Sequence, residues 1–241
     1  MKKILIVLFL LLAGFSFAQK KGYMSAGVYL ESGTRGVPFG AMAAHFSYNP
    51  IDNVILSATV YGSVQQPVTM DETTFMPAAR LKMTTVFPLK ASVIALEQSG
   101  WMRNFGYFDI REWNMQTLVS WQNPHWSIGL GLHDRLIRDL NSGIFDPSEP
   151  YVNEPFNLIY RLQYRLALEG KRWYATFRVT NFDYLFTDYY YNPGLGAGFN
   201  YILSKGPVLW ADLYFHPSGI FNLSPVFYES TLKLGATWNI Y

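Results

Sequence analysis

The chain has 241 residues, of which 50% are hydrophobic, 17% are aromatic and only 15% are charged. Its 19 basic and 17 acidic residues give a formal net charge of only +2, and no basic stripe is present that could neutralise the phosphates of a nucleic acid. The absence of cysteine excludes a disulfide framework and a thiolate zinc site.

The N-terminal segment, residues 1–18, has the pattern of a secretory signal peptide. Lys2 and Lys3 precede the apolar run 4–12, and Ala18 is a small residue at a plausible cleavage site. The run is short for a helix that spans a bilayer. Cleavage would leave residues 19–241, which contain no linker, charge run or repeat and form one predicted domain.

The remaining chain alternates apolar and polar residues at period two, which predicts strands. No uncharged apolar run after residue 18 approaches the ~20 residues that a spanning helix needs. Twelve strands are predicted, with ten as the fallback because the fifth alternates poorly. They cover residues 22–32, 37–48, 53–64, 75–87, 91–98, 106–121, 125–135, 156–168, 172–182, 194–203, 208–216 and 226–240.

The eighth of these segments shows the alternation most clearly. One face carries Phe156, Leu158, Tyr160, Leu162, Tyr164, Leu166 and Leu168, whereas the other carries Asn157, Arg161, Gln163, Arg165 and Glu169. A bulky apolar face opposite a face with two arginines is typical of a strand between lipid and a wet or salt-bridged lumen. The sequence therefore predicts an all-β fold, a transmembrane antiparallel up-and-down β-barrel.

The connections between the predicted strands alternate between tight and long. The tight ones are 49–52, 88–90, 122–124, 169–171 and 204–207, and the long ones are 65–74, 99–105, 136–155, 183–193 and 217–225. Seven aromatic residues lie near the tight turns or the C-terminus: Tyr48, Phe87, Trp121, Trp126, Trp173, Tyr201 and Trp238. This plan predicts periplasmic turns and termini, extracellular loops and an interfacial aromatic girdle.

The two ends of the chain resemble those of bacterial outer-membrane proteins. The junction of Ser16, Phe17, Ala18 and Gln19 resembles signal peptides of the Bacteroidota, and segment 231–241 resembles the terminal strand of outer-membrane barrels. The resemblance implies a Gram-negative outer membrane, contact with its lipid and lipopolysaccharide, and recognition by the barrel-assembly machinery. It identifies no subfamily.

The inward faces hold the candidate functional residues. We predict a pore lined by Arg80, Lys82, Glu112, Arg135, Arg161, Arg165, Arg178, Asp212, Glu229 and Lys233, and Glu97 also faces inward. Arg161, Arg165 and Arg178 lie on one predicted hairpin and could form a basic patch that selects anions. Alternatively, the charges form a salt-bridge network that fills a narrow lumen, because buried guanidinium groups need carboxylate partners.

A weaker candidate for chemistry lies near residue 216. His216, Ser218 and Glu229 supply a base, a hydroxyl and a carboxylate, which nucleophilic hydrolysis requires. The His-x-Ser spacing resembles a fragment of the motif of outer-membrane lipid A deacylases and phospholipases. Those families follow the serine with asparagine, whereas Gly219 follows it here, so no catalytic residue is assigned.

No cofactor or metal is expected, since His45, His125 and His133 lack metal-ligand spacing. Gly194, Gly196 and Gly198 are expected to make room for larger inward side chains. The leading expectation is a narrow passive channel for small polar or anionic solutes. The alternatives are a structural or assembly barrel that binds an unknown partner protein through its outer loops, and a lipid hydrolase.

Overall fold

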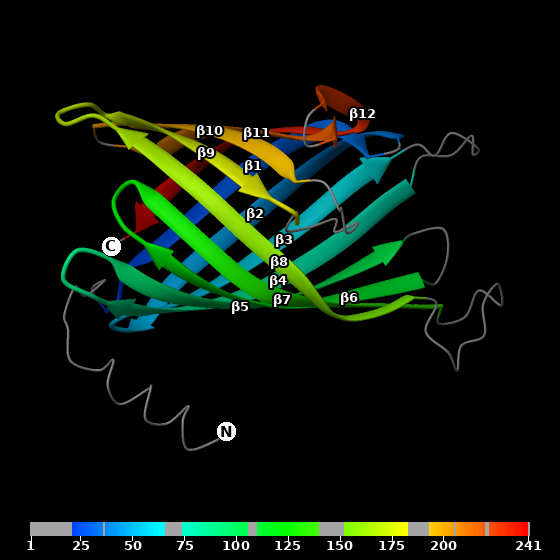
Figure 1. Ribbon diagram of the computed structural model, residues 1–241, viewed down its shortest axis with the longest axis horizontal. Coiled ribbons are helices and arrows are strands. Elements are labelled where there is room, and N and C mark those ends of the chain that lie inside the picture. The colour runs from blue at the N-terminus through cyan, green and yellow to red at the C-terminus, as the bar shows by residue number, and fades with distance from the viewer. Residues whose placement is uncertain are drawn as a thin grey trace, which may run out of the picture.

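The computed structural model describes residues 21–35, 37–65, 74–105, 110–139, 152–182, 193–204, 206–219 and 222–240, which form a closed antiparallel β-barrel (Figure 1). Each strand pairs with its neighbours in sequence, and β1 closes the barrel on β12. The predicted fold class is therefore confirmed, with all twelve strands present. They are β1 (Met24–Arg35), β2 (Val37–Ile51), β3 (Val54–Gln65), β4 (Thr74–Pro88), β5 (Val93–Phe105), β6 (Ile110–Gln122), β7 (Trp126–Asp139), β8 (Val152–Ala167), β9 (Trp173–Thr180), β10 (Gly194–Ile202), β11 (Val208–Gly219) and β12 (Asn222–Ile240).

One end of the barrel, which we name the turn end, gathers the five tight connections, the start of β1 and the end of β12 (Figure 1). The opposite end is named the loop end. The turns are held by local hydrogen bonds, for example from the amides of His125 and Trp126 to Oδ1 of Asn123, at 2.8 and 2.7 Å. Gly170 has a φ of 71°, which glycine adopts without strain in a tight turn.

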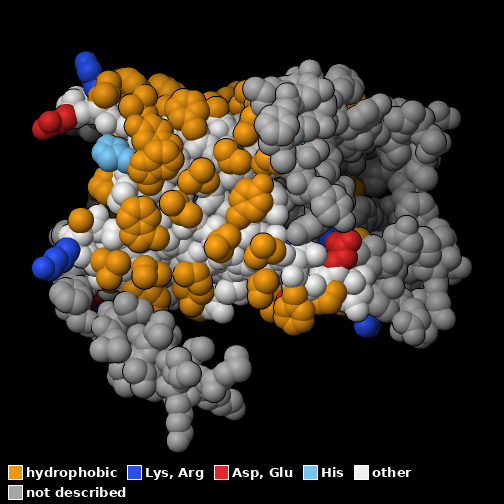
Figure 2. All heavy atoms as spheres, viewed as in Figure 1, with side chains coloured by type: hydrophobic (Ala, Val, Ile, Leu, Met, Phe, Trp, Pro, Cys, Tyr) orange, Lys and Arg blue, Asp and Glu red, His pale blue; other side chains and the backbone are white. Residues whose placement is uncertain are grey.

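The outer face of the barrel is an apolar belt, as the alternation predicts (Figure 2). Leu209 and Leu213 on β11 and Leu232 and Leu234 on β12 are exposed on this face. The predicted turn-end girdle is also on the outside, where Trp121, Trp126, Tyr201 and Trp238 are exposed with Tyr48. A folded chain whose leucines point outward at every second position is suited to hydrocarbon. Within the described ranges, no helix is long and apolar enough to cross a membrane.

The prediction that residues 99–105 form a long connection is wrong, because β5 continues to Phe105. In this stretch Gly100 faces outward and Trp101 is buried inside, so the usual order of a bulky outer and a small or polar inner residue is inverted. The backbone ladder to β6 continues regardless, because its hydrogen bonds do not depend on which face is apolar.

The predicted long connection 136–155 is too long at both ends, since β7 reaches Asp139 and β8 begins at Val152. Pro155 lies inside β8 at a register shift, where the pairing passes from His133–Asn157 to Arg135–Glu154. A bulge tolerates proline because its amide is not needed for the ladder. Phe156 has a φ of 61°, and its amide donates to Oδ1 of Asp134 at 2.6 Å.

The predicted loop 217–225 is likewise shorter, because β11 extends to Gly219 and β12 starts at Asn222. Two register shifts accompany this extension, between Phe215 and Pro217 and between Pro217 and Gly219. Strand pairing therefore continues past Pro217, but the period-two assignment of faces does not carry through it.

Candidate functional site

One ion pair in the barrel interior joins strands that are separated by two others. Arg161 of β8 donates from Nη2 to Oε1 of Glu97 on β5. Because β6 and β7 lie between these two strands, the pair crosses the interior. Lys82 Nζ lies 3.8 Å from the other oxygen of Glu97. The Glu97 carboxylate thus contacts one cation from β4 and another from β8.

A second carboxylate, Glu112 of β6, bridges two arginines toward the loop end. Arg103 of β5 donates to its Oε2, and Nε of Arg135 on β7 donates to its Oε1 at 2.8 Å. All three side chains are nearly buried. Arg135 also lies 3.9 Å from Glu154, which is half exposed. Both oxygens of the buried carboxylate therefore accept charged hydrogen bonds.

Two further ion pairs line the other side of the interior. Nη2 of Arg178 on β9 donates to Oδ2 of Asp212 on β11 at 2.5 Å. This contact passes over β10 at Gly196, where an added Cβ would come within 2.6 Å of Nε of Arg178. The expectation that the β10 glycines make room for inward side chains is confirmed at this residue.

Lys233 of β12 lies 3.7 Å from Glu31 of β1, and the hydroxyl of Tyr61 donates to the same carboxylate at 3.1 Å. Glu31 and Tyr61 are both buried. Since Tyr61 belongs to β3, this contact reaches over β2 and ties three consecutive strands together from the inside.

A cavity of about 670 Å³ occupies the half of the interior next to the turn end. Its charged lining consists of Arg80, Arg165, Arg178, Lys233 and a single carboxylate, Asp212. The remaining lining is polar or aromatic at Tyr29, His45, Thr59, Gln163, Tyr174, Thr176, Asn200, Trp210 and Thr237, and it is aliphatic or glycine at Gly198, Val208 and Ala211. The cavity wall is therefore basic.

Arg165 lines the cavity without a carboxylate partner among the described residues. Its guanidinium lies over the ring of Tyr174, 4.0 Å from the centroid, and the side chain is exposed. A cation above a ring face is attracted by the ring quadrupole without losing its charge. Arg165 therefore keeps its positive field directed into the cavity.

The loop-end half of the interior is filled much more tightly. Ala43, Tyr61, Met76 and Ala78 pack into one buried cluster there, and Leu118, Ile159 and Phe182 pack into a second, which begins at the middle of β6.

The ring of Trp101 stacks on His133 at a centroid distance of 5.5 Å, and Nε2 of His133 lies 2.8 Å from Oδ1 of Asn114. Two buried donors, Nε1 of Trp101 and Nε2 of Gln116, find no acceptor among the described residues. The barrel is thus open toward its turn end and narrow toward its loop end.

The predicted basic patch is not assembled as a unit. Arg161 contacts Glu97, Arg178 contacts Asp212, and Arg165 lies over Tyr174. The structure brings together Arg80, Arg165, Arg178, Asp212 and Lys233 around the cavity, whereas Lys82, Glu112, Arg135 and Arg161 form the two carboxylate-centred groups. Glu229 pairs with Arg35 in the backbone register, and its side chain lies outside the described residues.

Among the weak catalytic candidates, His216 is the one whose side chain the structure describes. His216 is buried, and its Nε2 lies 3.0 Å from the hydroxyl of Tyr214, whose ring it meets edge to face. Asp212, which lies on the same strand, is paired with Arg178. The side chain of Ser218 lies outside the described part of the structure, as does that of Glu229. No group of three or more histidines and carboxylates among the described residues could hold a metal ion.

Two buried interior charges, Glu31 and Arg103, are absent from the predicted pore lining. Glu31 follows Leu30, which alternation places outside, so its parity alone could have identified it as inward. Arg103 was hidden by the prediction that residues 99–105 form a loop. Extending the fifth strand would have placed it opposite Glu112, its direct cross-strand partner.

The comparisons with known proteins support the fold. No protein-family model and no curated protein sequence matches the chain. Among solved structures, an outer membrane channel from Pseudomonas putida F1 aligns with a TM-score of 0.55 at 9% identity, over 94% of this chain and 98% of that one.

The translocator domain of the autotransporter NalP from Neisseria meningitidis aligns with a TM-score of 0.55 at 14% identity, over 99% and 94% of the two chains. The KdgM porin aligns with a TM-score of 0.52 at 7% identity, over 90% and 99%. The chain therefore has the fold of outer-membrane β-barrels.

Proposed function

We propose that this chain is an outer-membrane barrel that forms a narrow passive channel for small anionic solutes. The observation that carries the proposal is the basic cavity, in which four cationic side chains face one carboxylate. In this proposal both termini and the turn end lie in the periplasm, lipid and lipopolysaccharide surround the belt, and the assembly machinery recognises β12.

The cavity would favour an anion for electrostatic reasons. Arg165 supplies a cation with no carboxylate partner among the described residues, and Arg178 and Lys233 supply further donors at the wall. Inside a barrel the effective dielectric constant is lower than in water, so fixed charges act on a solute more strongly there. Rings and ladders of arginine select anions for this reason in pores.

The pair formed by Arg161 and Glu97 narrows the interior beside the cavity. Because it crosses the interior, a solute must pass beside it. A narrow path lined in this way predicts small conductance with anion preference.

The experiment is a single-channel recording of the purified protein in planar bilayers under a KCl gradient. We expect a reversal potential of the sign for chloride preference. The double substitution Arg80→Gln/Arg165→Gln should move it toward zero, because it removes two cavity cations. The matched control is Arg138→Gln, an exposed arginine on the outward face of β7, which should leave the reversal potential unchanged.

A second candidate function is a structural barrel that binds a partner protein through its outer loops. The two buried clusters that contain Leu118 and Tyr61 favour it, since they narrow the interior. The same recording separates the two functions: a correctly folded protein without measurable conductance supports the structural barrel and contradicts the channel. A stoichiometric partner that co-purifies with the barrel would support it further.

A further inference from the structure

The middle of the lipid-facing belt carries a polar pair. The outward positions of β9, β10 and β11 are apolar or aromatic in the described structure. Phe177, Phe199 and Leu213 are examples, one from each strand. On β5 and β6, in contrast, Gln98 and Thr117 face outward as direct cross-strand partners. Both side chains are exposed, and neither makes a side-chain hydrogen bond within the described ranges.

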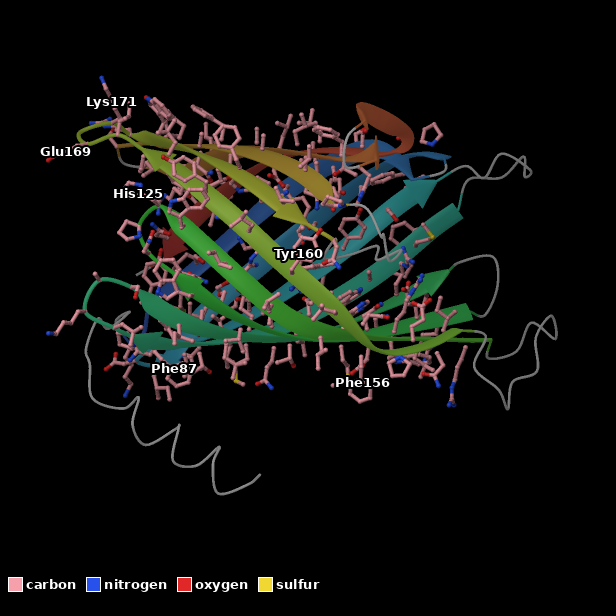
Figure 3. The ribbon with its side chains drawn as sticks, viewed as in Figure 1. Phe87, His125, Phe156, Tyr160, Glu169 and Lys171 are labelled. Atoms are coloured by element: carbon pink, nitrogen blue, oxygen red, sulfur yellow. The ribbon has the colours of Figure 1, made fainter. Side chains whose placement is uncertain are left out.

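The polar pair borders a groove of about 760 Å³ on the outer surface. Its floor includes Gly100, where an added Cβ would meet only the carbonyl oxygen of Asn114, at 3.6 Å. Its rim is formed by Phe156, Leu81 and Met115, which at 72%, 69% and 67% are the most exposed large hydrophobic side chains of the described residues. Figure 3 shows Phe156 pointing away from the barrel. Prominent apolar side chains thus stand beside a hollow.

The pair lies near mid-depth of the membrane. Thr117 is four residues from Trp113 and four from Trp121 on the outward face of β6. At a rise of ~3.3 Å per residue and a tilt of ~40°, each tryptophan is about 10 Å away along the barrel axis, close to half of a ~25 Å apolar band. Hydrocarbon at that depth offers no hydrogen-bond partner to the Gln98 amide, so leaving it in lipid is unfavourable.

We propose that this groove is the interface between two copies of the chain. A carboxamide carries both donors and an acceptor, so Gln98 can hydrogen-bond to Gln98 of a second copy across a two-fold axis. The same symmetry places the protruding Met115 or Leu81 of each copy in the hollow over Gly100 of the other. An acyl chain could fill the hollow but could not satisfy the amide.

Cross-linking tests the proposal directly because the chain contains no cysteine. Gln98→Cys, reconstituted in phosphatidylcholine vesicles at two protein-to-lipid ratios and oxidised, should give a disulfide-linked species of twice the monomer mass at both ratios. The matched control is Ala197→Cys, on the outward face of β10 and also five residues from the turn end of its strand. It should remain monomeric.

Sedimentation in detergent provides the second measurement. The wild-type chain should be dimeric, Gln98→Leu should weaken the dimer about tenfold by removing the paired amides, and Gly100→Leu should abolish it by filling the hollow. Gly40→Leu, at an outward glycine of β2 with nothing within 4 Å of the added Cβ, should have no effect.

Three results would overturn the proposal. The first is a wild-type monomer together with no cross-link at residue 98. The second is equal cross-linking at residues 98 and 197, which would indicate random collision. The third is a product whose mass shows a different protein attached at residue 98. If Gly100→Leu fails to fold, the cysteine experiment still decides between these results.

Discussion

The ion pairs of Glu112 allow a sharp prediction about what stabilises the interior. Glu112→Gln keeps the shape of the side chain but removes the charge that holds Arg103 and Arg135. The Glu112 side chain is only 1% exposed, so the arginines would lose a desolvated partner. Removing one partner of a buried pair costs about 3–5 kcal/mol. Arg135 keeps a second carboxylate, Glu154, at 3.9 Å. We therefore expect the free energy of unfolding to fall by an amount near the lower limit, about 3 kcal/mol.

The matched control changes the other carboxylate of the same arginine. Glu154 is 42% exposed, and its pair with Arg135 is long, so Glu154→Gln should cost no more than about 1 kcal/mol. Equilibrium unfolding in urea, followed by tryptophan fluorescence in detergent micelles, measures both losses. Equal losses in the two variants would refute the argument that burial makes Glu112 the more important partner.

Three other substitutions test separate parts of the structure in the same unfolding assay. Gly196→Val should cost about 1–3 kcal/mol, because its Cβ would displace Arg178 from Asp212, whereas Gly40→Val should be nearly neutral. Leu213→Arg, in the middle of the belt, should cost about 2–4 kcal/mol in lipid, and Leu203→Arg beside a tight turn at most about 1 kcal/mol. Asp134→Ala should cost about 1–3 kcal/mol, since it leaves the amide of Phe156 without its acceptor at the bulge.

The strands and their faces could be predicted from the sequence because a barrel wall repeats every two residues. Successive side chains of a strand point to opposite faces, so Leu209, Leu213 and Trp238 are on the outer face and the residues next to them in the chain are inside. The ends of strands were predicted wrongly where the alternation fails. Gly100 faces outward and Trp101 inward, which is the reverse of the usual order, and Pro155 lies at a bulge that periodicity does not reveal.

The ion-pair partners could not be predicted from parity alone. Alternation shows that Arg161 and Glu97 are both inward, but their contact depends on how far each lies from the ends of the barrel and on the stagger between strands. That stagger is set by the pairing of β5 through β8, including the bulge near Arg135. The pair of Glu112 and Arg103 is different, because the two residues are direct cross-strand partners. Predicting their contact required only the correct end of β5.

The orientation of β11 in lipid tests the membrane-spanning barrel most directly. Single cysteines at residues 209–215 of this cysteine-free chain can each carry a nitroxide spin label in phospholipid vesicles. The structure predicts that collision with oxygen, which concentrates in hydrocarbon, is high at 209, 211, 213 and 215 and low at 210, 212 and 214. A uniform profile, or one with the opposite phase, would contradict the assignment of the outer face to lipid.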